Sequence, residues 1–387
     1  MNVARLALTV GPFAIVVGCV AALMSPSAGD FFQFWFAGHL VATGSSPYDQ
    51  SEWVSAYARY GDLASVVRHN CPTIDAPACR WVYPPWTGWL LAPFGFLDPR
   101  SGIALEGITF LALLAGGVLL AVHSARIEPA WLRALVLLGV AVSTPFLTDA
   151  FSGHFDGLML VGLSLLGAGL AGRRALPLAI AAPILALKPH LFLALGPFVL
   201  LWLVRERQPR LVLIPAAILA ALAIVGLASD PRALPALGGA GSKLALVGST
   251  TWSFAAWAGP LAPVVAGALV LASAIAAAAA LRASSADRRA QVFVAAAAAV
   301  SLVVAPYVQL YDHLLLVPAV ALAVSFASAS GRRVAALAIV VAFVVAGWGA
   351  HALEQEGRTF AGLMPVSALV VLAASAYPTR RSVPSDL

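Results

Sequence analysis

The sequence is poor in charge, and this shortage indicates the class of protein. Lys, Arg, Asp and Glu make up 10% of the 387 residues, whereas 61% are hydrophobic. A soluble domain carries about 25% charged residues, and no stretch here is polar and long enough to form a separate soluble catalytic domain. Apolar runs recur along the whole length. We therefore expect an all-α, polytopic membrane protein that forms a single domain over residues 1–387.

Cysteine is also scarce, with three in the chain. Cys19 lies in the first apolar run, and Cys71 and Cys79 share one long loop. No CxxC pair occurs, so a zinc site built on cysteines is not expected. If the loop is exported to an oxidising compartment, we expect a disulfide between Cys71 and Cys79.

Apolar runs and short arginine-bearing loops together predict about twelve membrane crossings with both termini in the cytoplasm. Arginine pairs such as Arg173-Arg174 and Arg332-Arg333 recur at intervals, as the positive-inside rule requires. They account for the net charge of +6 without a nucleic-acid partner. The expected crossings are residues 6–24, 103–122, 131–147, 158–170, two within 175–204, 211–228, 261–281, 292–305, 314–328, 334–350 and 363–376.

Residues 25–84 form the longest segment that does not span, and we expect them outside the cell membrane as a helical loop. The apolar run before them resembles a signal peptide in length, but we interpret it as an uncleaved first span. Two interfacial helices are expected in the loop, over residues 31–41 and 52–67. Gly44 should end the first of them.

Asp30 is a carboxylate at the boundary of the first span, and aromatic residues follow it at once. This position makes it a candidate general base at the membrane face. A structural role competes, because Asp30 and Gln33 have the spacing of a helix capping box. The two roles are compatible, since a capping carboxylate is also held in one orientation.

Two segments are too short for ordinary spans. Residues 86–97 are expected to dip into the membrane as a half-helix, with proline at its first turn. Residues 175–204 run between two arginine pairs, so they must hold two short crossings with Lys188-Pro189-His190 at the apex. A helix N-terminus there, with a lysine and an imidazole, suits an anion such as a lipid phosphate. The alternative is a lysine that only snorkels to the interface.

The layout rests on apolar length and arginine alone, yet it places many other polar groups on the outer face. Polar residues at bilayer edges are costly and usually functional, although outer loops also contain polar residues without a role. The residues on this face include Asp30, His39, Tyr83, Asp149, His154, Asp156, Lys188, His190, Asp312 and His313.

Six motifs in a fixed order connect the chain with a known family. They are Asp30 after the first span, Gly44 with Pro47-Tyr48-Asp49, Tyr83-Pro84-Pro85, Gly153-His154, Lys188-Pro189 and His313. Over roughly residues 25–320 the chain resembles glycosyltransferase family 87, the polyprenyl-phosphate-mannose-dependent mannosyltransferases of the C-type membrane superfamily. The resemblance implies an enzyme of the bacterial cytoplasmic (inner) membrane with an extracytoplasmic active site, Asp30 as base and His313 at the site. Many relatives have Gly-Gln and a following Asn where this chain has Gly153-His154-Phe155-Asp156, so a donor or acceptor contact should differ there.

The leading hypothesis is an inverting glycosyltransferase, in which a substrate hydroxyl attacks the anomeric carbon and the polyprenyl phosphate leaves. Asp30 is then the base, and the expected ligands of the donor phosphate are Lys188, His190 and His313. Further substrate contacts are expected from Gln33, Tyr48, Tyr83, His154 and Asp156.

The hypothesis implies a polyprenyl-phosphate hexose as donor, with mannose suggested by the resemblance. The other partners are a lipid or glycan acceptor and membrane lipids. No cofactor is required, because the phosphate already bears its charge. The Asp-containing outer loops leave room for a divalent metal.

A transporter or flippase of a lipid-linked or anionic substrate is the main alternative, because broken helices beside charged residues are typical of transporters. Against it, the sequence shows no internal repeat, and its polar groups gather at one face. A third class, a lipid-binding or assembly protein without chemistry, gives no reason for the combination of Asp30 and Lys188.

Overall fold

The computed structural model describes residues 16, 29–60, 81–238, 255–305, 308–355 and 360–377, and every regular element in these ranges is a helix. The expected all-α class is therefore confirmed. The first half of the chain forms α2 (Gly29–Ala42), α3 (Gln50–Arg59), α5 (Pro85–Gly95), α6 (Pro99–Ser124), α7 (Ala130–Ala141), α8 (Thr144–Ser152), α9 (Asp156–Gly172), α10 (Ala175–Leu185) and α11 (Pro189–Arg205). The second half forms η2 (Pro209–Val212), α12 (Leu213–Ser229), α13 (Ala233–Gly238), η3 (Ala256–Leu261), α16 (Ala262–Ala283), α17 (Arg289–Val304), η4 (Leu310–Leu316), α18 (Val317–Ala329), α19 (Arg333–Gln355), η5 (Phe360–Leu363) and α20 (Met364–Ala376).

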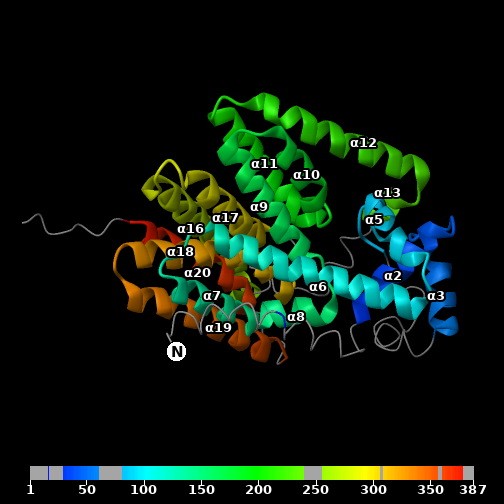
Figure 1. Ribbon diagram of the computed structural model, residues 1–387, viewed down its shortest axis with the longest axis horizontal. Helices are drawn as coiled ribbons and strands as arrows, with labels where there is room; N and C mark the ends of the chain where they lie inside the picture. The colour runs from blue at the N-terminus through cyan, green and yellow to red at the C-terminus, as the bar shows by residue number, and fades with distance from the viewer. Residues whose placement is uncertain are drawn as a thin grey trace, which may run out of the picture.

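The helices form an elongated body (Figure 1). Helices α2, α3 and α5 lie at one end, α16, α18 and α20 lie at the other, and α6 runs between them. Helix α9 packs against α6, α10 and α17, so it is central to the arrangement. Helix α17 is buried on all sides, and its small alanine side chains allow neighbouring helices to approach it closely.

The surface of the body is that of a helical membrane protein. In the described part of the chain, five helices are long and apolar enough to cross a membrane, and there are six if the bent pair α7–α8 is one span. Large apolar side chains point outward on α12, α16 and α19, for example Ile224, Leu271 and Val345. Such exposed apolar faces suit hydrocarbon rather than water.

The prediction of about twelve crossings is not confirmed. The expected spans 103–122, 211–228, 261–281, 314–328 and 334–350 fall in the five long helices. Others fall in shorter apolar helices, namely α9, α10, α11, α17 and α20. The expected first span, 6–24, lies outside the described residues apart from Val16.

The expected span 131–147 is not one straight helix, because two helices joined at a bend cover it. Helices α7 and α8 meet at an angle of 55°. Pro145, at the start of α8, has no N–H to donate to the carbonyl of Ala141, and its ring opposes a continuous helix. The bend directs α8 toward η4, against which it packs.

The first outer loop also differs from expectation. Helix α2 is not an interfacial helix, since Phe31, Phe32, Phe34 and Trp35 are all buried and cover its different sides. It already includes Asp30, so Asp30 does not stand at its N-cap. Gly44 follows the helix with φ of +80°, as its expected role requires.

Two further expectations for this region have mixed outcomes. Helix α3 ends at Arg59 rather than continuing to residue 67, and residues 61–80 lie outside the described part of the chain. The short helix expected at 86–97 is present as α5, with Pro85 in its first turn. Helix α5 packs closely against α2.

Candidate functional site

The centre of the candidate site is a buried ion-pair cluster of three residues from distant parts of the chain. Lys188 Nζ lies 2.6 Å from Asp156 Oδ2 and 2.5 Å from Asp312 Oδ1. Lys188 is 3% exposed, and both aspartates are fully buried. A lysine and two carboxylates without water would be very unfavourable apart, so the pairing fixes how three segments come together.

Each member stands at the beginning of a helix. Asp156 is the first residue of α9, and Lys188 is the N-cap of α11, just before Pro189. Asp312 completes a capping box at η4, where its Oδ2 accepts the backbone N–H of Gln309 at 2.6 Å. Carboxylates are favourable at helix N-termini, because free N–H groups and the helix dipole face them. Local capping therefore holds the carboxylate of Asp312, whereas that of Asp156 lies in the first turn of α9 and pairs with Lys188.

Further polar side chains surround this cluster. The carboxyl group of Asp149, on α8, interacts with that of Asp156, and Asp149 is only 2% exposed. Tyr311 stacks on His154 with ring centroids 3.7 Å apart, and its ring lies 4.6 Å from Lys188 Nζ. The buried surroundings thus hold three carboxyl groups for one ammonium group.

Two histidines expected to hold the donor phosphate lie at the same place. His190 follows Lys188 on α11, close enough to interact with the charges of Asp312 and Lys188. His313 is fully buried, and its Nδ1 lies 3.1 Å from the backbone carbonyl of Gln309. The structure thus brings His154, Asp156, Lys188, His190 and His313 into one region.

Gly153 joins α8 to the segment that carries His154 and Asp156. It ends α8 with φ of +76°, a conformation that costs glycine little. A Cβ atom at this position would lie 2.4 Å from the ring of Phe31. The Gly153-His154 motif therefore has a structural reason: glycine allows the turn and the close approach of α2.

An aromatic cluster connects α2 with the polar residues. Phe34 lies at 4.6 Å from Phe155 and 6.0 Å from His154, measured between ring centroids. Asp30 precedes Phe34 by one helical turn, so the two positions share one face of α2. The backbone of Asp30 is described and its side chain is not.

The remaining expected contacts lie farther along the aromatic cluster. The Tyr83 ring lies 5.3 Å from that of Phe155, and its backbone carbonyl accepts the hydroxyl of Tyr48 at 2.6 Å. Burial raises the pKa of Tyr48, which keeps its hydroxyl a donor. Gln33 is half-buried on α2 and takes no part in the hydrogen bonds and ion pairs of the described polar cluster. Cys71 and Cys79 lie outside the described residues, so their disulfide stays a prediction.

Sequence reasoning placed Asp149 and Asp312 on the outer face but gave neither a role, and it missed Tyr311. The spacing of Gln309 and Asp312 is a capping-box signal that could have placed Asp312 at a helix start. Its pairing with Lys188 spans 124 residues and has no local signal. Among the described residues, no group of three or more His, Cys, Asp and Glu is arranged to hold a metal ion.

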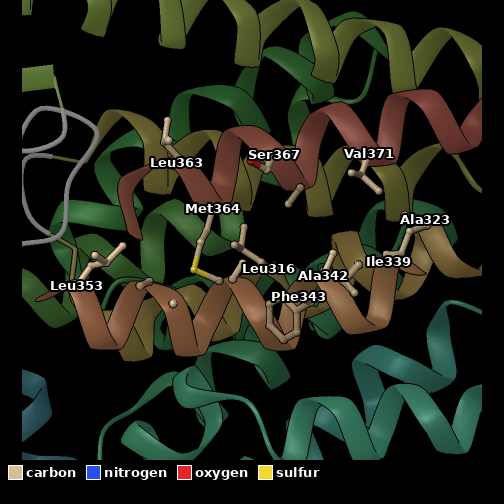
Figure 2. Close-up of a pocket in the computed structure, with 15 residues that line it drawn as sticks. Leu316, Ala323, Ile339, Ala342, Phe343, Leu353, Leu363, Met364, Ser367 and Val371 are labelled. Atoms are coloured by element: carbon tan, nitrogen blue, oxygen red, sulfur yellow. The ribbon is translucent and has the colours of Figure 1, made fainter. Parts of the chain in front are cut away.

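An apolar cavity of about 430 Å³ lies beside the site, between α18, α19 and α20 (Figure 2). Its lining includes Phe343, Met364 and Val371, with Ser367 as a polar member. Leu316 also lines it and is the last residue of η4, the element that carries Asp312 and His313. The polar cluster and the apolar cavity are therefore joined by one short helix.

The helix ends that lie opposite the polar cluster carry arginines. Arg288 donates to the backbone carbonyl of Ala125 at 2.7 Å, and Arg126 pairs with Asp287 at 3.6 Å. Helix α9 begins at Asp156 and ends before Arg173, which separates the two ends by about 25 Å at 1.5 Å per residue. The body thus has an arginine-bearing end and an end with the buried polar cluster.

Comparison with known proteins adds no relative. No protein-family model matches the chain, and none of the curated proteins or solved structures that were compared matches it.

Proposed function

We propose that the chain is a membrane glycosyltransferase that moves a hexose from a lipid-phosphate donor to a hydroxyl of a lipid or glycan acceptor. The observation that carries the proposal is the buried cluster of Asp156, Lys188 and Asp312, with His190 and His313 beside it. Ionisable residues within membrane proteins are costly and typically functional. The sequence resemblance to family 87 supports the same activity.

The adjoining cavity supports a lipid-linked donor. Its apolar lining suits a hydrocarbon chain, and one lining residue, Leu316, belongs to the element that carries Asp312 and His313. In this proposal the polar head of the donor lies at the cluster and part of its chain lies in the cavity. The site then belongs at the extracytoplasmic face of a bacterial inner membrane, because the arginine-bearing ends lie at the other end of α9.

The pairing of Lys188 refines its expected role. An ammonium group has three N–H donors, and in the structure two carboxylates already lie at hydrogen-bond distance from it. A donor phosphate would therefore bind the third N–H of Lys188, replace one carboxylate there, or bind to the imidazoles of His190 and His313. Asp30 accepts the proton of the attacking hydroxyl, and the phosphate leaves with its own charge.

The test is transfer of sugar from a polyprenyl-phosphate hexose by the purified full chain in lipid vesicles. Asp30→Asn should reduce turnover by about a hundredfold, the usual contribution of a general base, while donor binding changes little. Asp98→Asn is the matched control, because Asp98 caps α6 at an exposed position and asparagine caps nearly as well. Normal transfer by Asp30→Asn would show that Asp30 is not the base.

A transporter is the second candidate, because the structure contains the broken helices typical of that class. The α7–α8 bend leads into the cluster through Asp149, and the α10–α11 break carries Lys188. The vesicle experiment separates the two classes: an enzyme consumes the lipid-phosphate sugar, whereas a transporter moves it unchanged.

A further inference from the structure

A second, polar cavity of about 600 Å³ lies away from the ion-pair cluster. It is enclosed by the turn after α2, the start of α3 and α5, and the end of α12. Helices α5 and α12 meet closely, since a Cβ atom at Gly226 would lie 2.6 Å from Pro85 Cβ. The sequence layout places the loops after α2 and after α12 on the outer side.

The lining of this cavity is rich in hydrogen-bonding groups. Asp49, Glu52 and Asp230 contribute carboxylates, Arg232 contributes a guanidinium, and Trp89 contributes an indole. Hydroxyl groups are added by Ser45, Ser46 and Ser229. Two hydrogen bonds from Ser51 to Asp49 Oδ1 hold the pKa of Asp49 below its usual value, so this carboxylate stays ionised.

An adjoining cavity of about 370 Å³ extends the first one. Both are lined by Tyr48, Asp49 and Arg232, and the second adds the indoles of Trp53 and Trp81, which stack with centroids 6.1 Å apart. The Arg232–Asp49 pair, at 3.3 Å, stands where the cavities meet. Arg232 is 60% exposed, so this pair is a weak contact that a ligand can rearrange.

The charge balance selects the class of ligand. Among the residues that line this cavity, three carboxylates face one guanidinium, and there is no lysine or histidine of the kind that adjoins the ion-pair cluster, so a phosphate or another anion would be repelled. A neutral, hydroxyl-rich molecule fits, because carboxylates accept strong hydrogen bonds from hydroxyl groups and aromatic faces pack against the apolar faces of sugar rings. The volume lies within the usual range for small-molecule sites.

We propose that these joined cavities bind a neutral glycan, the part of the acceptor that lies away from the reacting hydroxyl. The acceptor role rests on the proposed glycosyl transfer, whereas glycan binding itself does not. Tyr48 connects the cavities with the candidate active site, because its hydroxyl donates to Tyr83, whose ring packs on Phe155.

The test is binding of mannotriose, maltotriose and cellotriose to the purified full chain, measured by saturation-transfer NMR and titration calorimetry. At least one trisaccharide should bind. Glu52→Gln and Asp230→Asn should each weaken it by about tenfold, since each removes a charge-assisted hydrogen bond. Glu206→Gln, at the end of α11, should leave binding unchanged.

Glu52 is half-buried in the first turn of α3, so Glu52→Gln should fold normally even if Asp230→Asn does not. The proposal fails if no trisaccharide binds to the wild type, if Glu52→Gln binds as well as the wild type, or if spermidine binds in place of sugars. Trisaccharide binding without donor consumption would refute the transferase and leave this site standing. Donor consumption without trisaccharide binding would refute this glycan site and leave the transferase proposal intact.

Discussion

At the residue scale, the pairing of Lys188 determines what its ammonium group can do. A snorkelling lysine would place its charge in water, but Lys188 is 3% exposed and lies between two carboxylates. The snorkelling alternative is therefore wrong. The expected free anion site is instead an ammonium that already has two carboxylate partners, so a phosphate would have to use its third N–H or displace one of them.

Removal of this ammonium should be costly. Lys188→Met leaves Asp156 and Asp312 buried without their cation, so the free energy of unfolding should fall by about 3–5 kcal/mol. Arg205→Met, on the exposed end of the same helix, should change it little. Denaturant titration of the detergent-solubilised protein measures both.

A double variant tests whether the uncompensated buried charge causes this loss of stability. Adding Asp312→Asn to Lys188→Met removes one uncompensated carboxylate and should restore part of the lost stability. If the losses of unfolding free energy caused by the two substitutions simply add, the ion pair is not what holds α9, α11 and η4 together.

At the scale of elements, the contact between α6 and α9 positions the start of α9 and therefore Asp156. A Cβ atom at Gly117 would lie 2.4 Å from the backbone carbonyl oxygen of Gly157, which follows Asp156. Backbone cannot move aside as a flexible side chain can. The two helices therefore pack through small residues, as membrane helices commonly do.

Adjacent glycines on α6 provide a matched test of this contact. Gly117→Ala should destabilise the protein by about 1–3 kcal/mol, the usual cost of overpacking, and should lower activity through Asp156. Gly116→Ala should be neutral or slightly stabilising, because nothing lies within 4 Å of its Cβ position and alanine favours helix. Thermal unfolding in detergent compares the stabilities of the two variants. Equal changes in stability would contradict the packing argument.

Some elements could be predicted from sequence because their signals are local. The break at Lys188-Pro189 follows from arginine flanks and a proline, and the short helix α5 follows from its length. The α7–α8 bend was missed although Pro145 marks it, because the apolar run continues across the proline. The burial of α2 could not be predicted, since it depends on Trp81, Phe110 and Phe155 from other segments.

At the scale of the whole molecule, the two ends of the helical body differ in charge. The polar cluster lies at the start of α9 and η4, while Arg126, Arg173 and Arg288 lie at the opposite end. This difference is what a membrane protein with a fixed orientation requires.

The orientation of the protein in the membrane can be measured by labelling cysteines placed at exposed positions. A cysteine beside Lys188 would be unsuitable, because Leu187 is buried. In a variant whose three native cysteines are replaced by alanine, Ser229→Cys should react with a membrane-impermeant maleimide in intact cells. Ser330→Cys, exposed after α18, should react only after permeabilisation. The reverse pattern would place the candidate site in the cytoplasm and contradict the proposed donor.

The separation of the three charged residues along the chain also determines the order in which the ribosome delivers them. Asp156 is synthesised 32 residues before Lys188, so the nascent hairpin of α10 and α11 finds one carboxylate already made. Asp312 emerges 124 residues after Lys188, when most of the helices exist. Until then the lysine has one of its two carboxylate partners, and its hairpin should remain loosely inserted during translation. The last step of biogenesis is then the docking of η4, which supplies the second carboxylate and closes the body around the lysine.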